Sequence, residues 1–180
     1  MPTAIYLEGT KTSNVDALKI ADSFGVKTLG WQPPHSTLNP TYSSNIESMK
    51  ALLPEVDEWE LPAPHNYDNT ALGIAYWGDW SNPNMQTFRE RSTYNTLLAA
   101  GLAGSMIDYG EYIEENLSFH NGMKGDEMHN FNAYVFTKTF HDIFKKGRGN
   151  DFVLFARAGC AGSQQFAGNF GGDQQATFDG

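Results

Sequence analysis

The sequence predicts an α/β fold with a parallel sheet, from three observations. Short apolar segments typical of strands alternate with amphipathic segments typical of helices along the 180 residues. Each strand-like segment is followed by a connection long enough for a crossover helix. No duplicated sequence and no linker divides the chain. The alternation fits either an open doubly wound sheet or part of a (β/α)8 barrel.

The first half of the chain contains two predicted strands and two predicted helices. The strands cover 3–9 and 26–31, and an apolar face over 14–25 predicts a helix between them. A second helix is expected over 43–55, where a proline ends it. Residues 54–70 are rich in proline, acids and aromatics, so we expect a long loop or small insertion there.

The second half predicts three more strands, over 71–77, 102–108 and 151–159. A helix over 83–101 begins at a proline in its first turn. The strongest prediction is a helix over 125–146, whose apolar residues recur at helical spacing. After the last strand the chain is rich in glycine and glutamine and shows no periodicity.

Composition excludes several classes of function. The net charge of −9 argues against nucleic-acid binding, which needs clusters of Lys and Arg. No apolar run reaches the roughly 20 residues of a membrane helix, and the first residues, MPTAIYLEGT, lack the features of a signal peptide, which favours the cytoplasm. The chain has one cysteine, so we expect no disulfide framework. Its five histidines lack the spacing of metal ligands, so we expect no metal site and no cofactor.

Acidic and aromatic residues follow the predicted strands at their carboxyl ends, where both architectures place function. The third strand ends in Trp77, Asp79 and Trp80, and the fourth ends in Asp108, Tyr109 and Glu111. The fifth ends in Arg157 and then the glycine-rich tail that holds Asp173. Carboxylates with aromatic rings and an arginine are typical of a carbohydrate site. Structural roles stay open at this point: a turn cap for Asp108, a solvated acid for Glu111, core tryptophans, and an arginine that only neutralises an acid.

Five motifs carry a family resemblance. DWSNP (79–83), IDYGEY (107–112), HNGMKGDEMHN (120–130), FARAGCAGSQQF (155–166) and FGGDQ (170–174) occur in the order found in glycoside hydrolase family 31. They are most similar to its sulfoquinovosidase-like branch. The resemblance implies a partial (β/α)8 TIM barrel of about five β/α units and hydrolysis of α-glycosides with retention, as in an α-glucosidase.

The resemblance also implies roles for single residues. Asp108 would be the nucleophile, ionised beside Arg157, and Asp173 the general acid/base, which must start protonated; apolar surroundings such as Phe170 or the charge of Asp108 would favour that state. Arg157 would hold a sugar hydroxyl. The other substrate-binding residues expected are Glu111, Phe170, Gln174 and Trp77.

The sequence also departs from the family pattern. Met106 and Phe170 stand where the family usually has tryptophan, and Gln165 where it has a basic residue. A complete barrel takes about 250 residues, so residues 1–180 are expected to be a fragment of one catalytic domain, unstable or associating alone. The alternatives are an inactive carbohydrate-binding remnant of the barrel and a sugar-phosphate or nucleotide enzyme on a doubly wound sheet.

Overall fold

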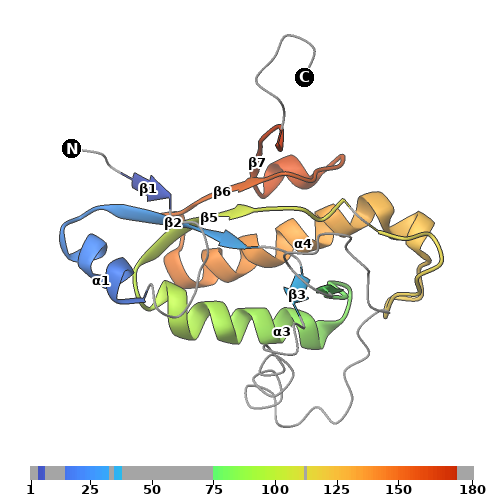
Figure 1. Ribbon diagram of the computed structural model, residues 1–180, viewed down its shortest axis with the longest axis horizontal. Coiled ribbons are helices and arrows are strands. Elements are labelled where there is room, and N and C mark those ends of the chain that lie inside the picture. The colour runs from blue at the N-terminus through green and yellow to red at the C-terminus, as the bar shows by residue number, and fades with distance from the viewer. Residues whose placement is uncertain (1–3, 7–14, 33–34, 38–74, 112, 174–180) are drawn as a thin grey trace.

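The computed structural model of the chain describes residues 4–6, 15–32, 35–37, 75–111 and 113–173, and its centre is a five-stranded parallel sheet (Figure 1). The spatial order is β1-β2-β5-β6-β7. The strands are β1 (Ala4–Tyr6), β2 (Lys27–Gln32), β5 (Leu102–Ile107), β6 (Val153–Ala156) and β7 (Gly168–Asn169). Every pairing between them is parallel, as the alternation of segments predicts.

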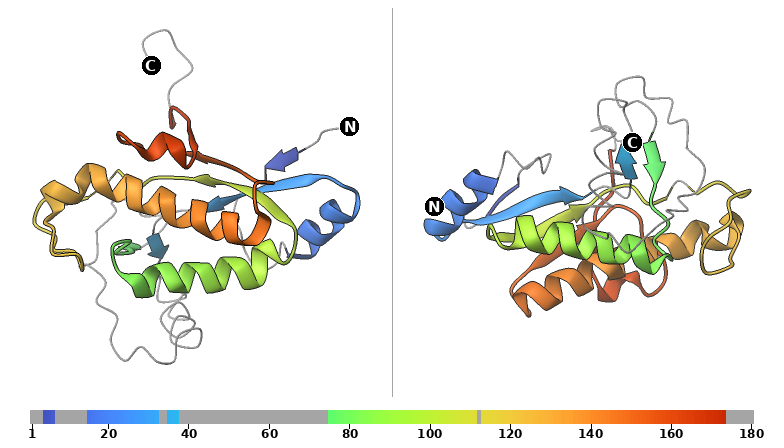
Figure 2. Two further views of the ribbon diagram at one scale, coloured as in Figure 1. Left: turned by 180° about the vertical axis from the view of Figure 1, so that it is seen from behind. Right: turned by 90° about the horizontal axis from the view of Figure 1, so that it is seen from below.

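The helices α3 (Pro83–Ser92) and α4 (Gly125–Arg148) lie on one side of this sheet, as the two further views show (Figure 2). A shorter helix, α1 (Val15–Ser23), connects β1 to β2, and a π-helical turn (Thr93–Leu98) continues α3 toward β5. All three helices confirm sequence predictions. Their apolar sides and one face of the sheet form the core, in which Trp80, Phe136, Phe140 and Phe144 are fully buried.

Helix α4 begins at the predicted residue and ends two residues after the predicted end at 146. The Glu127 side chain accepts a hydrogen bond from the Lys124 backbone N–H at 2.9 Å, which closes a capping box at the first turn. At the other end Gly149 has a φ of 64°, which glycine adopts without strain, and its N–H bonds the Lys145 carbonyl. Phe131 is the exception within the predicted apolar stripe, because its side chain is 40 % exposed.

The prediction of a third parallel strand over 71–77 is wrong in its pairing. Its described part, β4 (Ala75–Trp77), pairs antiparallel with β3 (His35–Thr37) in a separate two-stranded sheet. Strand β2 instead pairs directly with β5, so no place is left between them. An apolar run indicates a strand but not its partner, because the partner is chosen by contacts between distant segments.

The glycine-rich segment after β6 is more ordered than its composition suggests. A 3-10 helix (Ser163–Gln165) and β7 follow β6, and β7 adds a fifth parallel strand. Local hydrogen bonds shape the turn, since the Ser163 hydroxyl bonds both the N–H and the carbonyl of Cys160. Such bonds replace the periodic pattern on which helix and strand predictions depend.

Several predictions fall on residues outside the described ranges. These are the helix over 43–55, the insertion over 54–70 and Gln174. Among the described helices, none is long and apolar enough to cross a membrane.

Candidate active site

The site lies at the carboxyl ends of β2, β5 and β6, and the backbone ladder continues past these strands to hold it. The Asp108 N–H donates to the Gln32 carbonyl at 3.1 Å, and the Arg157 N–H donates to the Ile107 carbonyl at 2.9 Å. Asp108 and Arg157 are therefore fixed side by side at one edge of the sheet. The sequence prediction that the two meet at this rim is confirmed.

Strand alternation decides which side chains share the face opposite the helices. Gln32, Ile107 and Ala156 are buried toward the helices. Their alternates Trp31, Met106 and Phe155 are half-buried and form a row, because Trp31 pairs with Met106 and Met106 with Phe155. Asp108 and Arg157 come two residues after Met106 and Phe155, so they stand on this same face, one layer closer to the rim.

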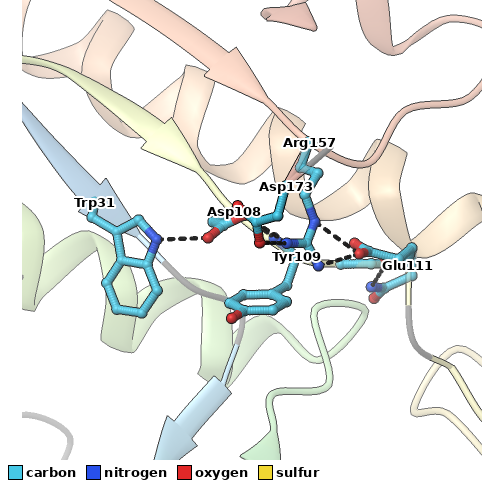
Figure 3. A network of polar contacts seen from close by, with 8 residues as sticks. Trp31, Asp108, Tyr109, Glu111, Arg157 and Asp173 are labelled. Carbon is cyan, nitrogen blue, oxygen red and sulfur yellow. Dashed lines mark hydrogen bonds and ion pairs between the residues drawn. The ribbon is translucent and has the colours of Figure 1, made fainter. Parts of the chain in front are cut away.

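Three donors contact the Asp108 carboxylate, whose side chain is 10 % exposed (Figure 3). Oδ1 accepts the Tyr109 backbone N–H at 2.9 Å and lies 3.3 Å from Nη1 of Arg157. Oδ2 accepts the indole N–H of Trp31 at 2.8 Å. Together these contacts fix the orientation of the carboxylate at the rim.

Arg157 is the centre of the site and contacts three carboxylates. Nε and Nη2 donate to one oxygen of Glu111, Nε at 2.8 Å, while Nη1 faces Asp108 and lies 3.4 Å from Oδ2 of Asp173. The guanidinium also stacks on the Tyr109 ring, with 4.1 Å between the guanidinium carbon and the ring centroid. The contacts with Tyr109, Glu111 and Asp108 hold this cation in place at the rim.

The two predicted catalytic carboxylates are brought together by this one nitrogen. Their oxygens lie 3.3 Å and 3.4 Å from Nη1, so they can be separated by at most about twice that distance. That span includes the separation of about 5–5.5 Å typical of retaining glycosidases. Asp173 differs from the expectation of apolar surroundings, because its side chain is 91 % exposed.

The turn that carries the nucleophile candidate is strained and anchored from below. Tyr109 has a φ of 59° and is the only described non-glycine residue with a positive φ. Gly110 follows with a φ of 100°, and a Cβ on it would lie 3.2 Å from the Phe136 ring. Its carbonyl accepts a 3.0 Å hydrogen bond from Asn132, a fully buried residue of α4. Helix α4 therefore anchors the turn that directly follows Asp108.

Other predicted rim residues have different places. Trp80 packs against Phe136 in the core, with 4.6 Å between ring centroids and 42° between ring planes. Asp79 is buried and accepts hydrogen bonds from Ser81 and from the His120 backbone N–H, so it holds the loop that precedes α4 and does not lie at the rim. The prediction that Asp79 and Trp80 lie at the rim is therefore wrong, because the strand before them, β4, belongs to the two-stranded sheet.

Phe170 and Gln165, which depart from the family pattern, both lie in the described part of the chain. The Phe170 N–H bonds the Ala156 carbonyl, and its ring packs edge-on against Phe155 beside the site. Gln165 folds back on the Gly162 carbonyl. The side chain of Trp77, like Gln174, lies outside the described part of the chain. Sequence reasoning missed Trp31, although its position one residue before the end of β2 could have indicated it.

Two cavities have different relations to these residues. One of about 330 Å³ adjoins Arg157 and is lined also by Gly159, Cys160, Ser163, Gln164 and Asn169. A larger one, of about 400 Å³, lies between α3 and α4 on the helix side, away from the carboxylates. Only Arg157 is shared between the described lining of the first cavity and the acidic group, so the functional site is placed at the rim, where Arg157 meets Asp108, Glu111 and Asp173. No group of three metal-ligating side chains occurs among the residues described.

Comparison with known proteins decides the family. The family model for the TIM-barrel domain of glycosyl hydrolases family 31 matches residues 15–180. The chain belongs to this family. In family 31 terms, the parallel sheet is part of the (β/α)8 barrel, with the site at its carboxyl edge.

Similar curated proteins within family 31 include two sulfoquinovosidases. The protein from Agrobacterium fabrum is 26 % identical over 163 residues, covering 89 % of this chain and 24 % of its own length. The one from Escherichia coli is 29 % identical over 99 residues, covering 53 % of this chain and 15 % of its own. An α-xylosidase from Emericella nidulans is 29 % identical over 86 residues, covering 46 % of this chain and 11 % of its own. The chain thus spans about a quarter or less of these relatives.

Solved structures agree on the fold. A family 31 sulfoquinovosidase from E. rectale, in complex with an aza-sugar inhibitor, superposes with a TM-score of 0.69 at 24 % identity, over 89 % of this chain and 24 % of that one. A cycloalternan-degrading enzyme from Trueperella pyogenes gives 0.73 at 19 % identity, over 92 % and 24 %. At these identities the likeness supports the partial barrel alone.

Proposed function

We propose that the protein is a retaining α-glycoside hydrolase in which Asp108 is the nucleophile and Asp173 the general acid/base. One observation carries the proposal: Nη1 of Arg157 lies within 3.4 Å of carboxylate oxygens of both residues. Residues 1–180 are one portion of the catalytic domain, and family membership supports a carbohydrate substrate. The sugar is an α-glucoside or a close relative; the named relatives also suggest α-xylosides and sulfoquinovosides.

The reaction has two steps. An oxygen of Asp108 bonds to the anomeric carbon while the bond to the leaving oxygen breaks, and the leaving oxygen takes the proton of Asp173. Asp173 then removes a proton from water, and the resulting hydroxide releases the sugar from Asp108 with its original configuration. No cofactor takes part in this proposal.

Arg157 and Glu111 prepare the site for these steps. Glu111 occupies two nitrogens of the guanidinium, which leaves Nη1 directed at the reacting carboxylates. A general acid must be able to reach the leaving oxygen of the substrate, yet Oδ2 of Asp173 lies 3.4 Å from Nη1 of Arg157. We therefore propose that a sugar hydroxyl takes the place of Asp173 at Nη1 when substrate binds. The exposure of Asp173 makes this exchange inexpensive.

The proposal is tested by Asp108→Ala in the full-length protein with an aryl α-glucoside, an aryl α-xyloside and an aryl sulfoquinovoside as substrates. Loss of a nucleophile should lower kcat by about 10⁴-fold or more on the preferred substrate. Asp151→Ala, on an exposed aspartate outside the site, is the matched control and should leave kcat unchanged. An Asp108→Ala protein with wild-type kcat would refute the assignment.

The alternative function is sugar binding without hydrolysis, and the 91 % exposure of Asp173 is the observation that favours it. Calorimetric titration with glucose and isomaltose separates the two. Binding by a protein that turns over none of the three aryl glycosides would support the alternative, whereas azide rescue of an Asp173→Ala variant would support the acid/base role.

A further inference from the structure

The indole of Trp31 contacts the nucleophile candidate, and neither the family motifs nor the roles proposed above include it. Its Nε1 lies 2.8 Å from Oδ2 of Asp108, across 77 positions of sequence (Figure 3). We propose that Trp31 is a positioning residue that aims Oδ2 at the anomeric carbon. This inference rests on the proposed function of Asp108.

The two oxygens of Asp108 have unequal surroundings. Oδ1 accepts the Tyr109 N–H and lies 3.3 Å from Nη1 of the Arg157 cation, so a hydrogen bond and an ion pair both act on this oxygen. Oδ2 accepts only the indole N–H within the ranges that the structure describes, so it keeps one lone pair for bond formation. Oδ2 is therefore the attacking atom, and the indole determines where its remaining lone pair points.

The indole is itself held in place. Trp31 sits one residue from the end of β2, where its backbone pairs with Met106 in the ladder next to Asp108. The Tyr109 ring meets the indole edge-on, with 6.5 Å between centroids and 74° between planes. The Tyr109 ring thus packs against the two side chains that contact the Asp108 carboxylate, the Trp31 indole on one side and the Arg157 guanidinium on the other.

The chemistry of the donor fits this role. An indole N–H only donates, carries no charge and does not titrate, so it orients the oxygen at every pH at which the enzyme works. A cation bound to the attacking oxygen would hold its charge more tightly before attack than during it, which opposes bond formation. Placing the cation on Oδ1 and a neutral donor on Oδ2 avoids that cost.

Two substitutions separate positioning from packing. Trp31→Phe keeps an aromatic ring and removes the donor, whereas Trp31→His keeps a ring N–H. The readout is covalent labelling of Asp108 by an α-glucosyl fluoride carrying fluorine at C5, followed by intact mass, which yields kinact and KI separately. Loss of a hydrogen bond to a charged group should lower kinact by about 10- to 100-fold in Trp31→Phe, with KI unchanged. Trp31→His should recover part of kinact.

The outcomes are distinguishable. Labelling of Trp31→Phe at the wild-type rate would overturn the inference. An equal loss of kinact in Trp31→Phe and Trp31→His, together with a higher KI and a lower melting temperature, would also overturn it, because it would indicate a packing role. Failure of the wild-type full-length protein to be labelled at all, with the Asp108→Ala protein behaving identically, would instead refute the proposed function and this inference with it. Normal labelling of wild type and slow labelling of Trp31→Phe alone supports both.

Discussion

Replacing Arg157 by Gln should destabilise the protein more than any surface charge substitution. The Arg157 side chain is 12 % exposed and its main partners, Asp108 and Glu111, are 10 % and 34 % exposed. Removing one partner of a buried ion pair leaves uncompensated charge and costs about 3–5 kcal/mol. The contact with Asp173 adds almost nothing, because that carboxylate is 91 % exposed. We therefore expect a loss of about 3–5 kcal/mol in the free energy of unfolding.

The assay is urea unfolding of the full-length protein, followed by tryptophan fluorescence, with Lys27→Gln as the matched control. Lys27 pairs with Asp151 at 3.1 Å, but both side chains are largely exposed, so this control should change stability far less than Arg157→Gln. The double variant Arg157→Gln, Asp108→Asn removes both charges and should recover part of the loss. Equal stability of Arg157→Gln and the control would refute the reasoning that one cation holds the acids together.

Two further predictions concern the sheet and a surface ion pair. A Cβ at Gly104 would lie 2.2 Å from the Val153 carbonyl oxygen, so Gly104→Ala should lower stability by about 1–3 kcal/mol. A Cβ at Gly168 would lie 3.9 Å from the Leu154 carbonyl oxygen, so Gly168→Ala should leave stability unchanged, and thermal melts of both variants compare the two. The hydrogen bond from Lys27 lowers the pKa of Asp151, so Lys27→Met should raise that pKa toward its ordinary value in an NMR titration. Stability from this pair is present at neutral pH and lost as the pH falls through the lowered pKa, and an unchanged Asp151 titration would contradict the pairing.

The local sequence predicted most elements of the barrel because each has a strong local signal. Helix α4 has an apolar stripe, a capping box and a terminal glycine, so its bounds follow from the sequence to within two residues. The carboxyl end of β5 was predictable to within one residue, whereas β6 ends three residues before the predicted end at 159; both predicted strands nevertheless placed Asp108 and Arg157 near the rim. Parallel strands place consecutive carboxyl ends at one edge, so proximity followed from topology.

Local signals failed where long-range pairing decides. The sequence of β4 is typical of an apolar strand, yet β4 pairs with β3. The two residues that follow it are therefore buried away from the rim, Asp79 in a structural role and Trp80 in the core. Strand β7 has two residues and no periodicity, and its pairing with the edge of β6 defines it as a strand.

By itself, then, the sequence determined the family, the alternation of strands and helices, and which acids stand after which strand, since these depend on residue order and local propensity. Only the tertiary structure decided that Trp31 reaches Oδ2 of Asp108, and that one nitrogen of Arg157 lies between Asp108 and Asp173. Those contacts join segments far apart in the chain, and their geometry depends on strand register and side-chain packing, which no local pattern encodes.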